Sequence, residues 1–507
     1  MTYLIGLDVG TTGIKAVLAD SAGKIIATEF VEYPLYFPQP AWAEQNPDDW
    51  HQAALRSLAG LVRQSGVRPA AVGGISFSGQ MHGLVCLDAN YKVLRPAILW
   101  CDQRTAAECR YITKKIGFSN LMKHVGNPAL EGFTLPKLLW IKRHEPDVFA
   151  RTRLILLPKD YVRFRLTGDI GIDESDAAGT IMMDLERRQW AAPILKAFGI
   201  KPSILPPIRE ATARAGQGLG REAAAKTGLP VGTPVIYGGA DNAVAAVANG
   251  LITPGLVAVS IGTSGTVIAP VKTARKDPRG RVHTFNHAVP GLWYLMGVMQ
   301  AAGLSLKWFR DNFGAEERAA ERKGGGDAYD LLIQKAAQVP PGAEGLVWLP
   351  YLQGERTPHG DANARGVLFG LSARHTRAHV IRAIIEGVSF GLRDSVEILR
   401  ELGVPMTEIR ITGGGAKSAF WRQMLADILQ HEVVSIAPQQ GPAFGAALIA
   451  GVGVGVYKSF EDCTRKIITV EHRSQPDRSK APIYDKMYAI YTSLYPRLKK
   501  VYKEAVR

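Results

Sequence analysis

Hydrophobic and polar residues follow two periods along this chain, one typical of β-strands and the other of α-helices. Short apolar runs predict strands at A-V-G-G-I-S-F-S (71–78), L-I-L-L (154–157) and P-V-I-Y-G (234–238). Apolar residues at helical spacing predict helices over residues 49–62 and 378–399. Strands and helices alternate in both halves, so we expect an α/β fold in which helices cover both faces of the sheets.

One segment near the N-terminus occurs again, in similar form, near the middle of the chain. The first copy reads L-I-G-L-D-V-G-T-T-G-I-K-A-V-L from Leu4, and the second reads A-V-S-I-G-T-S-G-T-V-I from Ala258. Each is an apolar strand, a turn of glycine and hydroxyl residues, and a second apolar strand. This order predicts a β-hairpin with glycine at positive φ. Two copies predict two homologous domains, the second beginning just before Gly255, with a ligand cleft between them.

Length and composition restrict the class of protein. A chain of 507 residues is too long for one ordinary core, and no apolar run reaches the roughly 18–20 residues that span a bilayer. The first apolar run contains an aspartate and follows no basic region, so we expect neither a signal peptide nor a membrane partner. The four cysteines match no metal-binding spacing and suit reduced thiols in a cytoplasmic protein.

The formal net charge of +15 raises the question of a nucleic-acid partner. Its densest basic groups, at 275–281 and 497–503, resemble a solvated turn and the polar face of a C-terminal helix. The remaining lysines and arginines are scattered, whereas phosphate-backbone binding usually needs them on one face. We therefore expect no nucleic-acid partner, although the charge would attract a small anion such as a nucleotide.

The two turns, G-T-T-G at 10–13 and G-T-S-G at 262–265, are candidate phosphate sites. Glycine lets backbone N–H groups approach a phosphate closely, and threonine or serine adds hydroxyl donors. Either turn alone is better explained as an ordinary hairpin, but two turns that face one cleft would clamp a polyphosphate. Asp8 precedes the first turn and offers oxygen to Mg²⁺, directly or through water. The alternative is an Asx hydrogen bond that stabilises the turn.

A third glycine turn, G-G-G-A-K-S at 413–418, lies between an apolar strand and a predicted helix. A bare backbone at a strand–helix junction admits a flat base or a ribose. The spacing does not match that of a P-loop.

A carboxylate and an amide, Asp241 and Asn242, also follow an apolar run and precede a predicted helix of small residues. One interpretation is helix capping, because both residue types accept hydrogen bonds from the first turn. The other is catalysis, in which Asp241 accepts a proton from a substrate hydroxyl and Asn242 binds a neighbouring hydroxyl. The two interpretations are compatible.

Together these motifs resemble the sugar kinases of the FGGY family, within the actin/hexokinase/Hsp70-like (ribonuclease H-like) ATPase fold. The segments at 132–144 and 366–387 are similar to further signatures of that family, and the resemblance runs in order from the first strand to about residue 455. S-G-Q-M-H-G at 78–83 is similar to the sugar-contacting loop of members that phosphorylate D-xylulose, where glycerol kinases carry an Arg-Glu pair. One departure is Ala240, where a glycine is frequent.

The resemblance implies an ATP- and Mg²⁺-dependent kinase for a ketopentose, D-xylulose first, whose two domains close around the substrates. It divides the chain into a sugar-binding, catalytic domain at 1–250, an ATP-binding domain at 251–455, and a helical extension at 456–507 packed on the second domain. The implied catalytic residues are Asp241 and Asp8, the latter holding Mg²⁺ through water. The implied sugar contacts are Met81, His82, Trp100, Asp102, Asp241 and Asn242. The implied nucleotide contacts are Thr11, Thr12, Lys15, Gly262, Thr263, Ser264, Gly303, Lys307, Gly414, Gly415 and Ala416.

Several alternatives remain open at the level of sequence. His82 could be a packed loop residue, and Trp100 and Asp102 could be a core residue and a cap. The chain could be another FGGY kinase acting on a ribulose or a related polyol. It could instead be an actin- or Hsp70-like ATPase without a small-molecule acceptor, or a sugar-responsive regulator with a degenerate kinase domain. For the oligomeric state, a homodimer is an analogy only.

Overall fold

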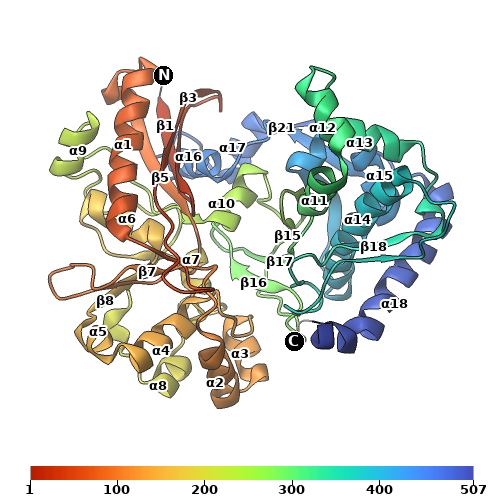
Figure 1. Ribbon diagram of the computed structural model, residues 1–507. Coiled ribbons are helices and arrows are strands. Elements are labelled where there is room, and N and C mark those ends of the chain that lie inside the picture. The colour runs from red at the N-terminus through yellow and green to blue at the C-terminus, as the bar shows by residue number, and fades with distance from the viewer. Residues whose placement is uncertain (1, 506–507) are drawn as a thin grey trace.

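Two large β-sheets, one in each half of the chain, form the framework of the protein (Figure 1). The structure, a computed structural model, describes residues 2–505. In the first sheet the strands follow the order β13-β5-β1-β2-β3. They are β1 (Tyr3–Val9), β2 (Gly13–Asp20), β3 (Ile25–Glu32), β5 (Val72–Gly79) and β13 (Gly239–Ala240). In the second sheet the order is β16-β17-β15-β14-β20-β21-β22. These strands are β14 (Gly255–Ile261), β15 (Gly265–Val271), β16 (His283–Asn286), β17 (Trp293–Met299), β20 (Met406–Thr412), β21 (Val433–Ala437) and β22 (Thr469–Ser474).

The two sheets share one topology. In the first, β13, β5 and β1 are parallel neighbours, followed by antiparallel β2 and β3. In the second, β21, β20 and β14 are parallel neighbours, followed by antiparallel β15 and β17. Each repeated segment of the sequence forms the hairpin at the centre of its sheet. The predicted duplicated α/β fold is therefore confirmed.

Helices surround and separate the sheets (Figure 1). Those of the first half are α1 (Pro47–Ser65), α2 (Ala106–Ile116), α3 (Phe118–Val125), α4 (Thr134–His144), α5 (Pro146–Arg151), α6 (Pro158–Thr167), α7 (Glu174–Ala178), α8 (Ala192–Phe198), α9 (Arg221–Thr227) and α10 (Asp241–Ala248). Those of the second half are α11 (Gly303–Phe313), α12 (Ala315–Arg322), α13 (Ala328–Ala337), α14 (Arg377–Glu401), α15 (Ala419–Leu429), α16 (Pro442–Gly453), α17 (Phe460–Ile467) and α18 (Ala481–Ala505). The remaining strands form short pairs: β4 (Glu44–Gln45) with β7 (Ala97–Ile98), β6 (Val85–Leu87) with β8 (Leu154–Leu156), β9 (Ile172–Asp173) with β12 (Ile208–Arg209), β10 (Met183–Asp184) with β11 (Gln189–Trp190), and β18 (Val347–Leu349) with β19 (Val367–Phe369).

The predicted helices over 49–62 and 378–399 lie inside α1 and α14. Local sequence fixes the ends of α1. The side chain of Asn46 accepts a hydrogen bond from the backbone N–H of Asp48, and Gly66 takes a left-handed conformation (φ 66°) after the last turn. The apolar stripe of α1 packs against β2 and β3.

One predicted strand is displaced. Residues 234–238 form only isolated bridges, at Val235 and Ile236, and the strand β13 begins at Gly239. Gly238 has a φ of 76°, and a Cβ there would lie 1.9 Å from the carbonyl oxygen of Phe77 in β5. The positive φ interrupts the extended backbone, which the apolar pattern alone does not reveal.

The two central hairpins form as predicted, but their glycines differ from expectation. Gly10, Gly13, Gly262 and Gly265 all lack a positive φ. At Gly13 the requirement is space, because a Cβ would lie 2.6 Å from the carbonyl oxygen of Val31. The expectation of positive φ at these turns was wrong.

Helix α16 crosses from the second half of the chain to the first. It packs against β1 and β5 and against α10, so that both helices lie between the two sheets (Figure 1). Gly6 permits this approach, because a Cβ there would lie 1.8 Å from the carbonyl oxygen of Ala443 in α16. Gly445 permits the helix crossing, because a Cβ there would lie 2.3 Å from the carbonyl oxygen of Val244 in α10.

The C-terminal segment packs on elements of the second half. Helix α18 packs on α14, α15 and β18, while α17 packs on α16. Among residues 2–505, none of the helices combines the length and apolar character needed to cross a bilayer. The four cysteines, all within the described chain, are free thiols.

Candidate active site

Several candidate site residues of the first half lie at the carboxyl ends of three parallel strands. Residues 10–12 follow β1, residues 80–82 follow β5, and Asp241 and Asn242 follow β13. Because β13, β5 and β1 are neighbours, these ends meet at one edge of the sheet. In the second sheet, residues 262–264 follow β14 in the same way. Parallel strands therefore bring together motifs that are far apart in sequence.

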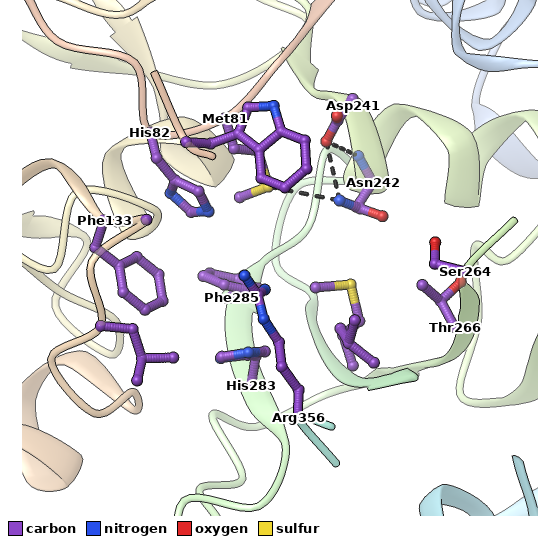
Figure 2. A pocket seen from close by; sticks show the side chains of 15 residues that line it. Met81, His82, Phe133, Asp241, Asn242, Ser264, Thr266, His283, Phe285 and Arg356 are labelled. Carbon is purple, nitrogen blue, oxygen red and sulfur yellow. Dashed lines mark hydrogen bonds between the residues drawn. The ribbon is translucent and has the colours of Figure 1, made fainter. Parts of the chain in front are cut away.

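A cavity of about 260 Å³ lies between these loops and the second sheet. Its volume is below the roughly 300–1,000 Å³ of sites for drug-sized ligands, so it suits a smaller molecule. The first half contributes Met81, His82, Trp100, Phe133, Asp241 and Asn242 (Figure 2). The second half contributes Ser264, Thr266, His283, Phe285 and Arg356. We call this space the acceptor cavity.

Asp241 is the first residue of α10, rather than its cap. The N-cap position is Ala240, which makes no side-chain capping hydrogen bond. Asp241 Oδ1 accepts hydrogen bonds from the backbone N–H of Asn242 (2.7 Å) and from Asn242 Nδ2 (2.9 Å). Its Oδ2 accepts none from any described residue, so this oxygen remains available to a ligand in the acceptor cavity. Asp241 thus accepts a first-turn N–H, as the capping interpretation predicts, but does so from the first helical position, and the predicted helix start at Asp241 is confirmed.

The electrostatic environment of Asp241 suits a proton acceptor. Burial and the neighbouring charge of Asp8 raise the pKa of Asp241 to about 7, against the opposing effect of the two hydrogen bonds from Asn242. A carboxylate with a pKa near the working pH can both accept and release a proton efficiently.

This pKa predicts a pH dependence of the reaction. A base must be deprotonated to act, so kcat/KM for the acceptor should rise about tenfold per pH unit below about pH 7 and reach a plateau above it. Initial rates between pH 5.5 and 8.5, at saturating nucleotide, measure this dependence. The residual activity of Asp241→Asn should lack the rising limb, which separates Asp241 from titration of the nucleotide. A flat wild-type profile would contradict the assignment.

His82 has the uncommon positive φ of 70° for a residue with a side chain. Its Nδ1 lies 2.7 Å from the carbonyl oxygen of Gly179, so Nδ1–H donates and Nε2 is left as an acceptor. Its own carbonyl oxygen accepts from Lys137 Nζ (3.0 Å) and Thr134 Oγ1 (3.1 Å). Burial holds the pKa of His82 well below its usual value, so the ring is neutral. His82 is therefore both a hydrogen-bonded loop residue and a lining residue of the cavity.

Trp100 and Asp102 differ in position. The indole of Trp100 lines the acceptor cavity, and its Nε1 donates to Thr11 Oγ1 (2.9 Å). Asp102 is fully buried, and its carboxylate accepts from the backbone N–H of Ala43 (2.7 Å) and pairs with Arg104 (2.7 Å). Both oxygens are thus used inside the protein. The structure contradicts a direct sugar contact by Asp102 and assigns it a structural role.

A second cavity, of about 620 Å³, lies beside the second sheet and has the size of a nucleotide site. The candidate residues that line it are Gly262, Thr263, Gly303, Lys307, Gly414 and Gly415. Ala416 is 1% exposed and lies beneath it. Thr12 and Lys15 have exposed side chains that border neither cavity.

The G-T-S-G turn lies between the two cavities. Thr263 lines the nucleotide-sized cavity, whereas the next residue, Ser264, lines the acceptor cavity. A phosphoryl group passing from one cavity to the other would therefore pass this turn. The backbone N–H groups and hydroxyls of the turn are suited to phosphate oxygens.

Several lining residues were missed by sequence reasoning. In the acceptor cavity they include Phe133, His283, Phe285 and Arg356. In the second cavity, Tyr329 and Asp330 of α13 are additional. Phe133 lies in the segment 132–144, whose resemblance to a family signature pointed to the segment but not to this residue.

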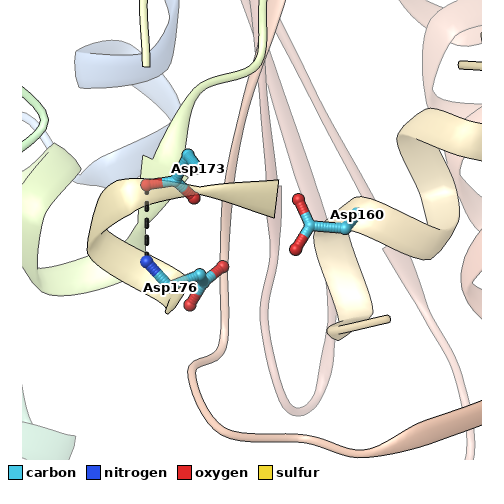
Figure 3. Close-up of side chains that lie close together, drawn as sticks. All are labelled: Asp160, Asp173 and Asp176. Carbon is cyan, nitrogen blue, oxygen red and sulfur yellow. Dashed lines mark hydrogen bonds between the residues drawn. The ribbon is translucent and has the colours of Figure 1, made fainter. Parts of the chain in front are cut away.

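Three buried aspartates, Asp160, Asp173 and Asp176, form a cluster (Figure 3). Lys159 Nζ lies 2.7, 2.6 and 2.9 Å from their carboxylate oxygens, respectively. Although burial opposes its charge, these carboxylates raise the pKa of the Lys159 ammonium. The ammonium thus occupies the place that a metal ion would take, so this cluster is an ion-pair network.

Hydrogen bonds connect this network to the segment that carries Asp241. Ser175 Oγ donates to Asp173 and accepts from the backbone N–H of Ala240 (2.9 Å), the residue before Asp241. The same short helix, α7, is followed by Gly179, which holds the ring of His82. Lys159 and its partners therefore anchor the segments that carry Asp241 and His82.

Comparison with known proteins agrees with this geometry. Residues 3–248 match the N-terminal domain, and residues 257–454 the C-terminal domain, of the FGGY family of carbohydrate kinases. A xylulose kinase of Bacillus subtilis is 43% identical over 499 residues, which cover 98% of each chain. A gluconokinase of Bacillus licheniformis is 33% identical and covers 99% of this chain and 97% of its own. The crystal structure of xylulose kinase from Rhodospirillum rubrum superposes with a TM-score of 0.91 at 34% identity, covering 99% of this chain and all of that one.

Proposed function

We propose that this chain, which belongs to the FGGY family of carbohydrate kinases, transfers the γ-phosphoryl group of ATP to a terminal hydroxyl of D-xylulose. The product is D-xylulose 5-phosphate. The observation that carries the proposal is the free Oδ2 of Asp241 in a small cavity that meets a nucleotide-sized cavity at one turn. This arrangement provides a base, an acceptor site and a donor site in the order that the transfer requires.

The proposed mechanism assigns a role to each group that faces the acceptor. The acceptor oxygen attacks the γ-phosphorus, the bond to ADP breaks, and the hydroxyl proton passes to Asp241. Transfer of this kind has a loose transition state, so the protein acts mainly by positioning and by stabilising charge. Asn242 and the neutral His82 Nε2 would orient the sugar hydroxyls by donating and accepting hydrogen bonds.

A magnesium ion fits the residues around Asp8. Asp8 Oδ1 is buried and has no hydrogen-bond partner among the described residues, and burial raises the pKa of this carboxyl. A buried carboxylate oxygen without a partner suits a hard cation or a water bound to it. Bound with ATP, Mg²⁺ would neutralise charge on the β- and γ-phosphates. Asp8 would hold the ion, and Thr263 and Ser264 would contact the phosphates.

A coupled ADP-release assay across acceptors tests the proposed function. We expect kcat/KM for D-xylulose to exceed that for L-ribulose, D-ribulose, glycerol and D-gluconate by at least about tenfold, since a lost buried hydrogen bond alone costs about 1–3 kcal/mol. A higher value for another acceptor would keep the kinase activity and replace the substrate. If no sugar changes the rate of ATP hydrolysis but a protein partner does, the result would instead favour an Hsp70-like ATPase.

A further inference from the structure

Arg356 lines the acceptor cavity, but the mechanism above assigns it no role. It lies between β18 and β19 and extends its side chain into the acceptor cavity (Figure 2). Within residues 2–505, its guanidinium forms no hydrogen bond or ion pair. Arg356 is half-buried, and its N–H donors, which have no partner among the described residues, are free to donate to a ligand in the cavity.

Nearby carboxylates do not neutralise this group. Glu131 is close enough to favour the charge of Arg356, but it lies beyond ion-pair distance. Burial raises the pKa of Glu355 to about 8, so this neighbour is mostly neutral at pH 7. Glu355 Oε1 already accepts from the backbone N–H groups of Gln300 (2.9 Å) and Arg356 (2.8 Å).

Arg356 is also the one cationic group that lines the acceptor cavity in the described chain. Both histidines that line it are neutral, because burial holds the pKa of His82 well below its usual value and lowers that of His283 to about 3. The other charged lining residue is Asp241. Figure 2 shows the side chains of Asp241 and Arg356 entering the cavity from opposite sides. The cavity therefore has an acid at one end and a cation at the other.

This polarity fixes which part of an acceptor each end can bind. The hydroxyl that is phosphorylated lies at Asp241, next to the turn that carries Ser264. The opposite end of a five-carbon acceptor then lies at Arg356. A guanidinium presents two parallel N–H donors, which match two neighbouring oxygens far better than one.

We propose that Arg356 selects the acceptor by binding the two oxygens at its C1–C2 end, the carbonyl and hydroxyl of an α-hydroxyketone. The same fork accepts a carboxylate, so aldonates of the same length enter the cavity. Sugar alcohols lack both the carbonyl and the carboxylate and bind less tightly. This inference rests on the proposed function for the orientation of the acceptor.

The γ-phosphate of ATP is a less suitable partner for Arg356. The phosphate must reach the acceptor past Thr263 and Ser264, whereas Arg356 enters the cavity from the side opposite Asp241 (Figure 2). An arginine that stabilised the transferred phosphate would change kcat for every acceptor equally. An arginine that binds C1–C2 changes KM, and does so according to the chemistry of that end.

The test compares D-xylulose, xylitol and D-xylonate in wild type, Arg356→Met and Arg356→Lys. In the wild type, D-xylonate should compete with D-xylulose. In Arg356→Met, KM for D-xylulose and the inhibition constant of D-xylonate should rise about 10- to 100-fold, the loss expected for charge-assisted hydrogen bonds. The dissociation constant of xylitol, measured by calorimetry, should change less than about threefold. Arg356→Lys keeps the charge but lacks the two parallel N–H donors. Its KM for D-xylulose and its inhibition constant for D-xylonate should lie between those of wild type and Arg356→Met.

Controls separate binding from folding. Arg374, whose side chain is 64% exposed and pairs with Glu344 on the surface, provides the matched variant Arg374→Met, which should leave all constants unchanged. The thermal midpoint of Arg356→Met should be no lower than that of wild type, which shows that the variant folds. Equal losses for D-xylulose and xylitol, or no competition by D-xylonate in the wild type, would overturn the inference. If another ketose proves to be the substrate, Arg356→Met should affect that ketose, its alditol and its aldonate in the same order. Failure of the proposed substrate can therefore be distinguished from failure of this inference.

Discussion

Replacement of Asp241 by asparagine is expected to lower kcat by about 10²–10⁴-fold, the usual contribution of a general base. Asparagine keeps the shape of the side chain, and its Oδ1 can still accept the hydrogen bonds that Asn242 donates. We therefore expect KM for both substrates to stay within about threefold. Steady-state kinetics of the purified variant measure both constants, and near-normal turnover would reduce Asp241 to a structural helix residue.

The same substitution should stabilise the folded protein. The pKa of Asp241 is raised from 3.8 to about 7, so folding favours the protonated form, and stability falls as pH rises between these values. Asparagine is neutral throughout, and the gain above pH 7 should be on the order of 1–4 kcal/mol, since each pKa unit corresponds to about 1.4 kcal/mol. The thermal midpoint of the variant should exceed that of wild type at pH 8 and approach it near pH 4. A lower midpoint at pH 8 would mean that the carboxylate is not destabilising.

Replacement of Lys159 by methionine should have the largest effect on stability. It leaves Asp160, Asp173 and Asp176 in the interior without the ammonium that lies within 2.9 Å of each. Removing one partner of a buried ion pair costs about 3–5 kcal/mol, which corresponds to a decrease of roughly 3–5 °C in the thermal midpoint of a chain of this length. Differential scanning fluorimetry measures this decrease.

The matched control is Lys226→Met. Lys226 pairs with Glu222 on the surface, where its side chain is 48% exposed, so its removal should change stability by no more than about 1 kcal/mol. If Lys159→Met were as stable as this control, the buried network would not anchor the segments that carry Asp241 and His82. Circular dichroism at low temperature should show that the variant still folds, which allows its midpoint to be interpreted.

Local sequence patterns predicted the parts of the fold that depend on neighbours in the chain. The hairpins around the two G-T-[TS]-G turns, the helices α1 and α14, and the helix that begins at Asp241 all follow from alternation and turn residues. The internal repeat also predicted the shared topology of the two sheets, because similar segments form similar local structures. The candidate residues Met81, His82, Asp241, Asn242 and Ser264 all line one cavity.

The features that were missed depend on contacts between distant segments. The sequence suggested that Asp102 could contact the sugar. In the fold its carboxylate instead accepts a hydrogen bond from Ala43 and pairs with Arg104. Arg356 enters the acceptor cavity from the long connection between β18 and β19. This connection has no regular hydrophobic pattern from which its path could be predicted. Likewise, the interruption at Gly238 reflects its close approach to β5, which becomes evident only when both strands are in place.

The position of α16 has a consequence for biosynthesis. The strands of the first sheet end at Ala240, but the helix that covers β1 and β5 consists of Pro442–Gly453. At about 5–20 residues per second, a ribosome needs about 10–40 s to add the intervening chain. During that time one face of the first sheet lacks its natural cover and is open to chaperones or to aggregation. The first half therefore cannot complete its fold until residues 442–453 of the second half have been synthesised.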